Sequence, residues 1–227
     1  KTSLKFRKAH RYLGLFLGIQ FLFWTISGLY FSWTDLDEIH GDHFKKIKIK
    51  KDFKDLISPS DLDYVNGIKS IELRDFNNNP YYWINNEFLV NANTGIKKDS
   101  ISKDEAISIS NENILEKYKI SFVEKIYEVG NHHEYRGKPL PAYVISYDSN
   151  DNLKSYISIN DGKFQTVRHR SWRWFDFLWM THTMDYENRD DFNNKLIRAF
   201  SVMGLITVMS GFLLWFVTSK TVRKIFK

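Results

Sequence analysis

Histidine is the residue type in this chain with the clearest capacity for metal or redox chemistry. Five of the seven histidines flank two long charge-free stretches of the sequence: His10, His40, His43, His169 and His182. Neutral imidazole is the usual ligand of b-type haem, and a low-spin electron-transfer haem generally takes two imidazoles. One histidine before the first stretch and several beyond its far end would suit haem groups near both faces of a bilayer.

The sequence excludes several other chemistries. It contains no cysteine, which rules out disulfides, thiolate nucleophiles, iron–sulfur clusters and covalently attached c-type haem. It also lacks a Gly-rich phosphate loop and the G-x-S-x-G and H-E-x-x-H motifs. A hydrolase therefore has no support, and no catalytic residue is assigned.

His182 ends the aromatic segment 171–182, SWRWFDFLWMTH. In a helix, Trp172, Phe175, Trp179 and His182 would share one face. An interfacial amphipathic segment over residues 171–186 that anchors in a membrane is one interpretation. The other is a face that holds a flat macrocycle with His182 as its ligand, while Arg173 and its neighbours Arg168 and Arg170 pair with haem propionates or lipid phosphates.

The remaining histidines leave alternatives open. His40 and His43 would share one helical turn beside several carboxylates, as a solvated helix end, a zinc, iron or manganese site, or, for His40, a haem ligand. His10 falls within about 40° of Gly14 on a helical wheel, so it would face a helix bundle or lie among lipid headgroups. His132 and His133 precede a Gly/Pro-rich loop and are expected at the surface.

The two charge-free stretches, 12–33 and 199–217, are each long enough to cross a bilayer, which needs about 20 helical residues. We expect transmembrane helices at 12–34 and 196–218, the first as a retained signal-anchor rather than a cleaved signal peptide. Nine of the 33 Lys and Arg residues lie in the tails 1–11 and 219–227, which contain no acid. The positive-inside rule then places both termini in the cytoplasm.

The intervening domain, residues 35–170, then lies outside the cytoplasm in a periplasm-like space. It is mildly acidic, so the basic composition reflects membrane topology and does not indicate nucleic-acid binding. Its pattern of one helix followed by strands and an Asn-Thr-Gly or Asn-Asp-Gly turn occurs twice, which predicts two tandem α+β modules at about 52–100 and 101–168. The expected helices are 58–65 and 102–118; the expected strands or hairpins are 68–76, 80–86, 87–97, 122–129, 142–149 and 154–167.

Small residues form a stripe on each predicted membrane helix, with Gly14, Gly18 and Gly28 on the first and Gly204 and Gly211 on the second. Such stripes let helices approach closely. The two stripes would pack on each other, on a second copy in a homodimer, or line a slot for a cofactor.

Three segments together resemble the PepSY-associated transmembrane proteins: HRYLGLFLGIQFLFWTISGLYFSW, ISINDGKF and HTMDY…SGFLLWF. The resemblance implies a multi-pass protein of the bacterial inner membrane with periplasmic PepSY modules. Longer members with four spans are similar to haem-containing ferric-siderophore reductases, whereas this chain has two spans.

From the histidines and the resemblance we expect a haem-b-binding electron-transfer component, or reductase subunit, acting toward a periplasmic ferric complex. His10, His40 and His182 are the candidate haem-iron ligands, with His10 paired across two copies and His182 paired with His40. The alternative is a non-catalytic PepSY interaction module, or an accessory subunit of a larger membrane complex.

Overall fold

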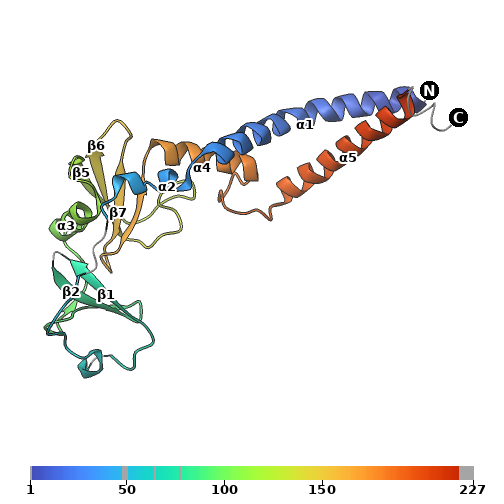
Figure 1. Ribbon diagram of the computed structural model, residues 1–227. Coiled ribbons are helices and arrows are strands. Elements are labelled where there is room, and N and C mark those ends of the chain that lie inside the picture. Colours follow the sequence, from blue (N-terminus) through green and yellow to red (C-terminus); the bar gives the residue numbers. More distant parts are fainter. Residues whose placement is uncertain (1, 48–50, 64, 77, 220–227) are drawn as a thin grey trace. The chain divides into compact units, whose positions relative to one another are not determined.

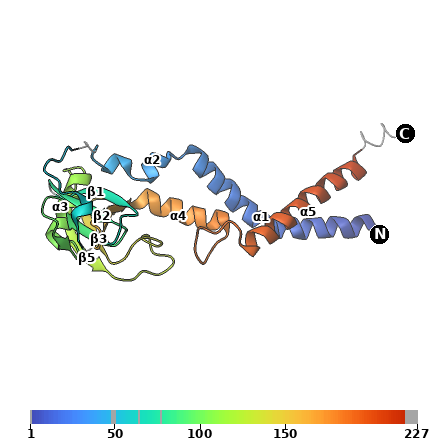
Figure 2. The same ribbon diagram turned by 90° about the horizontal axis from the view of Figure 1, so that it is seen from below.

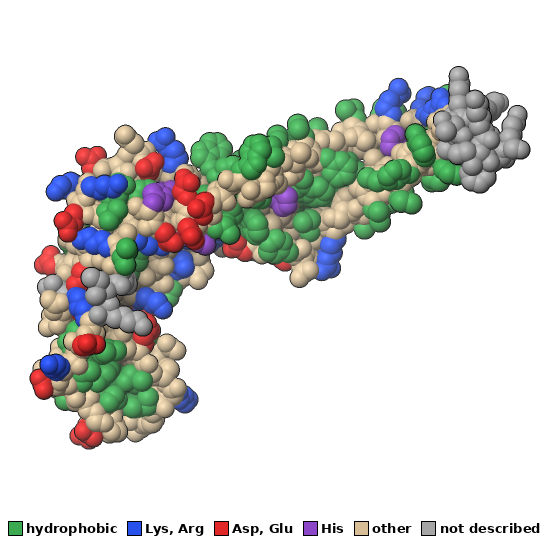
Figure 3. Space-filling view, viewed as in Figure 1, with side chains coloured by type: hydrophobic (Ala, Val, Ile, Leu, Met, Phe, Trp, Pro, Cys, Tyr) green, Lys and Arg blue, Asp and Glu red, His purple; other side chains and the backbone are tan. Residues whose placement is uncertain are grey.

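The computed structural model describes residues 2–47, 51–63, 65–76 and 78–219. The fold is α+β, with an apolar helix near each end of the sequence and two antiparallel sheets between them. Contacts divide the chain into a helical unit, Lys1–Thr34 with Trp174–Lys227, and a sheet unit, Asp35–Arg173. Hydrophobic side chains cover α1 and α5 of the helical unit, whereas charged side chains gather over the sheet unit (Figure 3).

The helical unit consists of α1 (Thr2–Trp33), α5 (Lys195–Thr218) and the part of α4 (Arg170–Thr183) that follows Arg173. Its segments Arg7–Trp33 and Lys195–Thr218 are long and apolar enough to cross a membrane. Leu15, Ile19 and Phe212 are 72%, 63% and 64% exposed. Such apolar surface is typical of a helix that faces lipid or a partner.

Helices α1 and α5 pack against each other in antiparallel directions (Figures 1 and 2). Phe16 stacks on Phe200 with 5.7 Å between ring centroids. Asn194 caps the start of α5 by accepting a hydrogen bond from the Ile197 amide at 2.9 Å. The last described residue of α5 thus lies at the same end of the pair as the start of α1 (Figure 1).

The two glycine stripes do not pack on each other, contrary to one of the sequence expectations. A Cβ atom at Gly204 would lie 2.9 Å from the Phe21 ring, and one at Gly211 would lie 3.3 Å from His10 Cε1. The α5 stripe therefore receives larger side chains of α1. By contrast, a Cβ at the α1 stripe, Gly14, Gly18 or Gly28, would meet nothing within 4 Å among the described residues. That stripe is open to another partner.

The sheet unit contains two four-stranded antiparallel sheets whose strands follow sequence order. The first sheet comprises β1 (Ile71–Phe76), β2 (Asn79–Ile84), β3 (Phe88–Asn91) and β4 (Lys97–Lys98). The second comprises β5 (Lys119–Ile126), β6 (Ala142–Asp148), β7 (Lys154–Ser158) and β8 (Phe164–Arg168). Short elements α2 (Leu36–Ile39), η1 (Asp42–Phe44) and η2 (Pro59–Asp61) precede the sheets, and α3 (Lys103–Asn113) lies between them in sequence.

Helix α3 begins where its capping signal predicts. Ser102 Oγ accepts a hydrogen bond from the Glu105 amide, and the Glu105 carboxylate accepts one from the Ser102 amide. The expected helix 102–118 is too long, because α3 ends at Asn113 and Ile114 has extended backbone. The expected helix 58–65 is only the single 3₁₀ turn η2. Its sequence offers few apolar positions and runs into Asn66-Gly67, so a longer helix has no face to bury.

Both sheets contribute to one hydrophobic core together with α3. Phe76 and Leu89 of the first sheet belong to the same buried cluster as Ile145 and Ile157 of the second sheet, and Ala106 of α3 also belongs to it. At the turn between β7 and β8, Gly162 has φ of +61°, and a Cβ there would overlap the Phe76 ring. Glycine is required at this turn because of both its backbone angle and the close approach of that ring.

Candidate functional site

The helical unit contains two matching pairs of histidine and serine. On α1, His10 Nδ1 lies 2.7 Å from Ser210 Oγ of α5. On α4, His182 Nδ1 lies 2.7 Å from Ser27 Oγ of α1. Each imidazole thus contacts a serine hydroxyl on a neighbouring helix through the same ring nitrogen.

The serine hydroxyls also lie near helix carbonyls. Ser210 Oγ is 2.7 Å from the Thr207 carbonyl oxygen, and Ser27 Oγ is 2.7 Å from the Phe23 carbonyl oxygen. A serine has a single O–H donor. These contacts are compatible with a tautomer in which each histidine donates its Nδ1–H to the serine oxygen and keeps its lone pair on Nε2. Among the described residues, neither Nε2 atom makes a hydrogen bond.

This arrangement is the one that metal-binding histidines need. A ligating imidazole coordinates through one nitrogen and donates the other N–H to a fixed acceptor, which holds the ring orientation and its tautomer. Burial lowers the pKa of His182, which keeps its ring neutral near pH 7 and able to coordinate.

Side chains of α1 also hold the C-terminal turn of α4 in place. Trp24 Nε1 donates to the His182 carbonyl at 2.8 Å, and Gln20 Nε2 donates to the Thr181 carbonyl at 3.3 Å. These donors satisfy carbonyl groups that a helix end otherwise leaves unpaired. The Phe31 ring meets the His182 ring edge-on at 5.6 Å between centroids. Three contacts therefore fix the position of His182: the hydrogen bond of its ring to Ser27, the hydrogen bond of its carbonyl to Trp24, and the contact of its ring with Phe31.

Three of the four side chains expected on one face of α4 meet in this unit, Phe175, Trp179 and His182, whereas Trp172 belongs to the sheet unit. Phe31 contacts Phe175 and Trp179 as well as His182, with centroid distances of 5.0 and 5.7 Å to the first two. Phe175 and Trp179 stack on each other at 5.9 Å. The shared face therefore packs on α1 and ends at the imidazole.

The two pairs lie far apart along α1. Ser27 is 17 residues after His10 in one continuous helix. At a rise of about 1.5 Å per residue, this corresponds to about 25 Å. The structure does not bring His10 and His182 together, and the part of the chain that it describes holds no group of three or more His, Cys, Asp or Glu side chains suited to a metal ion.

His40 belongs to the sheet unit, and its predicted partnership with His43 on one helical turn is wrong. Helix α2 ends at Ile39, and Gly41 has φ of +74°, a left-handed conformation that breaks the helix between the two histidines. His43 instead packs against Phe44 and His169. The pairing of His40 with His182 would join the two units and stays a prediction.

Arg173 has a protein partner in the sheet unit. Its Nε and Nη2 atoms donate to the two Glu134 carboxylate oxygens at 2.6 and 3.0 Å, and Tyr156 Oη donates to the same carboxylate at 2.6 Å. Burial raises the pKa of Glu134, but the hydrogen bonds from Arg173 and Tyr156 outweigh burial and lower that pKa overall. This ion pair is the partner of Arg173 within the sheet unit, and contact of Arg173 with a haem propionate stays a prediction.

The neighbouring arginines are also held by the protein. Arg168 Nε donates to the Glu134 carbonyl at 2.8 Å, and Arg170 Nη2 donates to the Asn150 carbonyl at 2.7 Å.

Sequence reasoning missed the residues that complete these sites. Ser27 and Ser210 are hydroxyl residues inside apolar helices, and such polar groups often mark functional positions in membrane segments. His169, one of the five histidines that flank the apolar stretches, is 2% exposed in the sheet unit, where its Nε2 lies 3.1 Å from the Ile39 carbonyl oxygen. It packs as part of a core.

Comparisons of the chain with protein-family models, with curated proteins and with solved structures find no match.

Proposed function

We propose that the chain is a haem-b-binding electron-transfer component of a bacterial inner membrane, with a PepSY-like extracytoplasmic domain that faces a periplasmic ferric complex. The observation that carries this proposal is the pair of imidazoles whose Nδ1 atoms each lie 2.7 Å from a serine oxygen of a neighbouring helix, while neither Nε2 atom makes a hydrogen bond among the described residues. The resemblance of the sequence to PepSY-associated transmembrane proteins supports the same assignment.

The membrane arrangement in this proposal follows from the two apolar helices. Helices α1 and α5 span the bilayer, both basic tails lie in the cytoplasm, and the sheet unit lies outside. The pair of His10 with Ser210 then lies toward the cytoplasmic face, and the pair of His182 with Ser27 lies toward the outer face. Their separation of about 25 Å along α1 is close to the thickness of a bilayer core.

His10 and His182 would hold the haem iron, because neutral imidazole with an oriented N–H is a common ligand of haem. Bound haem would supply one-electron transfer at each position. The chain's residues would orient the ligands: Ser210 contacts His10, and Ser27, Trp24 and Phe31 contact His182.

A second imidazole at the His10 position would come from another chain, because none of the other described histidines lies in α1 or α5. A second copy is the simplest source. The Gly14 and Gly18 positions, one and two turns from His10, are open on the surface of α1 and leave room for a neighbouring helix. The proposed assembly is therefore a homodimer with His10 from each copy at one site.

One observation favours the alternative function, a PepSY interaction module or accessory subunit without haem. The open face at Gly14, Gly18 and Gly28 fits a partner helix whether or not a cofactor is present. This alternative predicts that the histidines can be replaced without loss of binding to the partner.

Haem content of the purified full-length protein separates the two functions. We expect His10→Ala and His182→Ala each to lower the haem-to-protein ratio measured by the pyridine haemochrome assay. His132→Ala, in a loop of the sheet unit, is the matched control and should leave the ratio unchanged. Ser27→Ala and Ser210→Ala should weaken retention less, since they remove only the acceptor that orients each ring. Equal haem content in all variants would favour the interaction module.

A further inference from the structure

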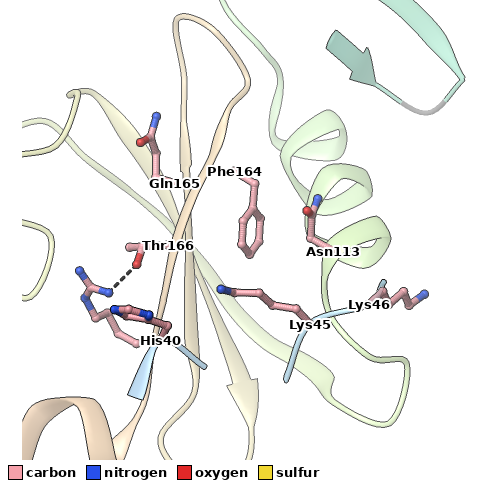
Figure 4. Close-up of a pocket in the computed structure, with 8 residues that line it drawn as sticks. His40, Lys45, Lys46, Asn113, Phe164, Gln165 and Thr166 are labelled. Atoms are coloured by element: carbon pink, nitrogen blue, oxygen red, sulfur yellow. Dashed lines mark hydrogen bonds between the residues drawn. The ribbon is translucent and has the colours of Figure 1, made fainter. Parts of the chain in front are cut away.

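The sheet unit contains a pocket of about 360 Å³ beside the β8 strand (Figure 4). Its walls come from the segment after α2, the last residue of α3, and β8. The residues that line it are His40, Lys45, Lys46, Asn113, Phe164, Gln165, Thr166 and Arg168.

The lining has a strong bias in charge. Lys45, Lys46 and Arg168 are cations, and no Asp or Glu is among the lining residues. The Lys45 side chain extends into the centre of the pocket toward Phe164 and Thr166 (Figure 4). Concave sites lined by one sign of charge concentrate ions of the opposite sign. The pocket therefore favours an anion.

Both lysines can be recruited by a ligand. Lys45 Nζ pairs with Asp42 at 2.7 Å and Lys46 Nζ pairs with Glu116 at 3.0 Å, and these carboxylate side chains are 52% and 89% exposed. Ion pairs this exposed add little to stability, because water competes with each partner. A ligand anion in the pocket can replace the two carboxylates at a small cost in free energy.

The backbone around the lysines is held in place. The Lys46 amide donates to the Asn113 carbonyl at 2.8 Å, and the Leu115 amide donates to the Phe44 carbonyl at 3.0 Å. The Arg168 guanidinium is also fixed, because it lies 3.8 Å from the Trp172 ring centroid and donates to the Val167 carbonyl at 3.0 Å. Arg168 thus supplies a fixed positive charge, while the lysine side chains move to the ligand.

We propose that this pocket binds a small molecule with carboxylate or phosphate groups. Lys45 contacts the anionic groups, the Lys46 side chain, which points away from Lys45 and Phe164 in Figure 4, turns toward them, and the Phe164 ring packs against the flat or apolar part of the ligand. This proposal does not require the electron-transfer function, because neither Lys45 nor Phe164 is a candidate haem ligand, although His40, which is one, also lines the pocket.

The test is isothermal titration of the full-length protein in detergent at low salt, with citrate and inorganic phosphate as separate probes. We expect saturable binding of at least one probe that weakens as salt increases. Lys45→Gln should weaken that binding about tenfold or more, which corresponds to the loss of one charged contact of about 1.4 kcal/mol. Citrate alone would assign a carboxylate ligand, and phosphate alone would assign a phosphoryl ligand; either result supports the site.

Lys103→Gln is the control, because it makes the same charge change at the first turn of α3, at the opposite end of that helix from Asn113. It should bind like the wild type. Lys45→Arg keeps the charge and should retain binding if loss in Lys45→Gln reflects the site rather than misfolding. No saturable binding of either probe, or equal weakening by Lys103→Gln and Lys45→Gln, would overturn the proposal.

Discussion

Removal of one partner from the half-buried ion pair between Glu134 and Arg173 should destabilise the sheet unit. Glu134→Ala removes the acceptor for two Arg173 nitrogens and for the Tyr156 hydroxyl. Loss of one partner from a buried pair costs about 3–5 kcal/mol. The Glu134 and Arg173 side chains are 14% and 29% exposed, so water replaces part of the lost partner. We therefore expect Glu134→Ala to lower the free energy of unfolding by about 3 kcal/mol, the lower end of that range.

Thermal melting of the full-length protein in detergent, followed by circular dichroism, measures this cost. In a chain of this size each kcal/mol shifts Tm by about 2–4 °C, so Glu134→Ala should lower Tm by about 6–12 °C. Glu134→Gln keeps the shape and the acceptor for Tyr156, and should lower Tm by less. Glu128→Ala, at an exposed position after β5, is the control and should leave Tm nearly unchanged.

A double-mutant cycle with Arg173→Met isolates the pair itself. We expect a coupling energy of about 2 kcal/mol between the two positions. A coupling energy near zero, or a Glu134→Ala variant that melts with the wild type, would refute the assignment of Arg173 to the protein interior and would leave its guanidinium available for another partner.

Three further changes test the fold. Burial lowers the pKa of His169 from its ordinary value of 6.5, so at lower pH the unfolded chain binds a proton that the folded chain does not bind. The stability that is present above pH 7 is therefore lost as the pH falls. His169→Gln should flatten the change in Tm between about pH 7 and pH 5, whereas His132→Gln should not. Gly162→Ala should lower the free energy of unfolding, measured by chemical denaturation, by about 2–4 kcal/mol, because of the left-handed backbone and the overlap with Phe76. Gly137→Ala should show the backbone cost alone, because a Cβ there meets no described atom within 4 Å. Gly204→Leu should separate α1 from α5 and lower Tm. Gly14→Leu should leave the Tm of the isolated chain unchanged and alter only the oligomeric state, measured by light scattering. The opposite pattern would contradict the packing of α1 on α5.

Local signals in the sequence predicted much of the secondary structure. The capping box at Ser102 starts α3, the turn at Gly162 joins β7 to β8, and the aromatic period of residues 172–182 forms one helix, α4. Each of these depends on neighbours a few residues apart, which the sequence displays directly.

Contacts between residues far apart in the chain could not be predicted from the sequence. Ser210 is 200 residues from His10, and Glu134 is 39 residues from Arg173. No periodicity in the sequence links such partners. The serine partners of the histidines and the partner of Arg173 could therefore be identified only from the structure. The prediction that His40 and His43 share one helical turn failed for a local reason. Gly41 adopts a left-handed conformation, which a glycine permits but does not require.

The visible absorbance spectrum of the protein, purified from cells grown with adequate haem, tests the proposed function most directly. We predict a Soret band and, after reduction with dithionite, the sharp α and β bands of a low-spin haem with two imidazole ligands. These bands should be diminished in His10→Ala and in His182→Ala and retained in His132→Ala. A spectrum without a Soret band in the wild type, in a sample whose circular dichroism shows a folded protein, would contradict haem binding and the electron-transfer function with it.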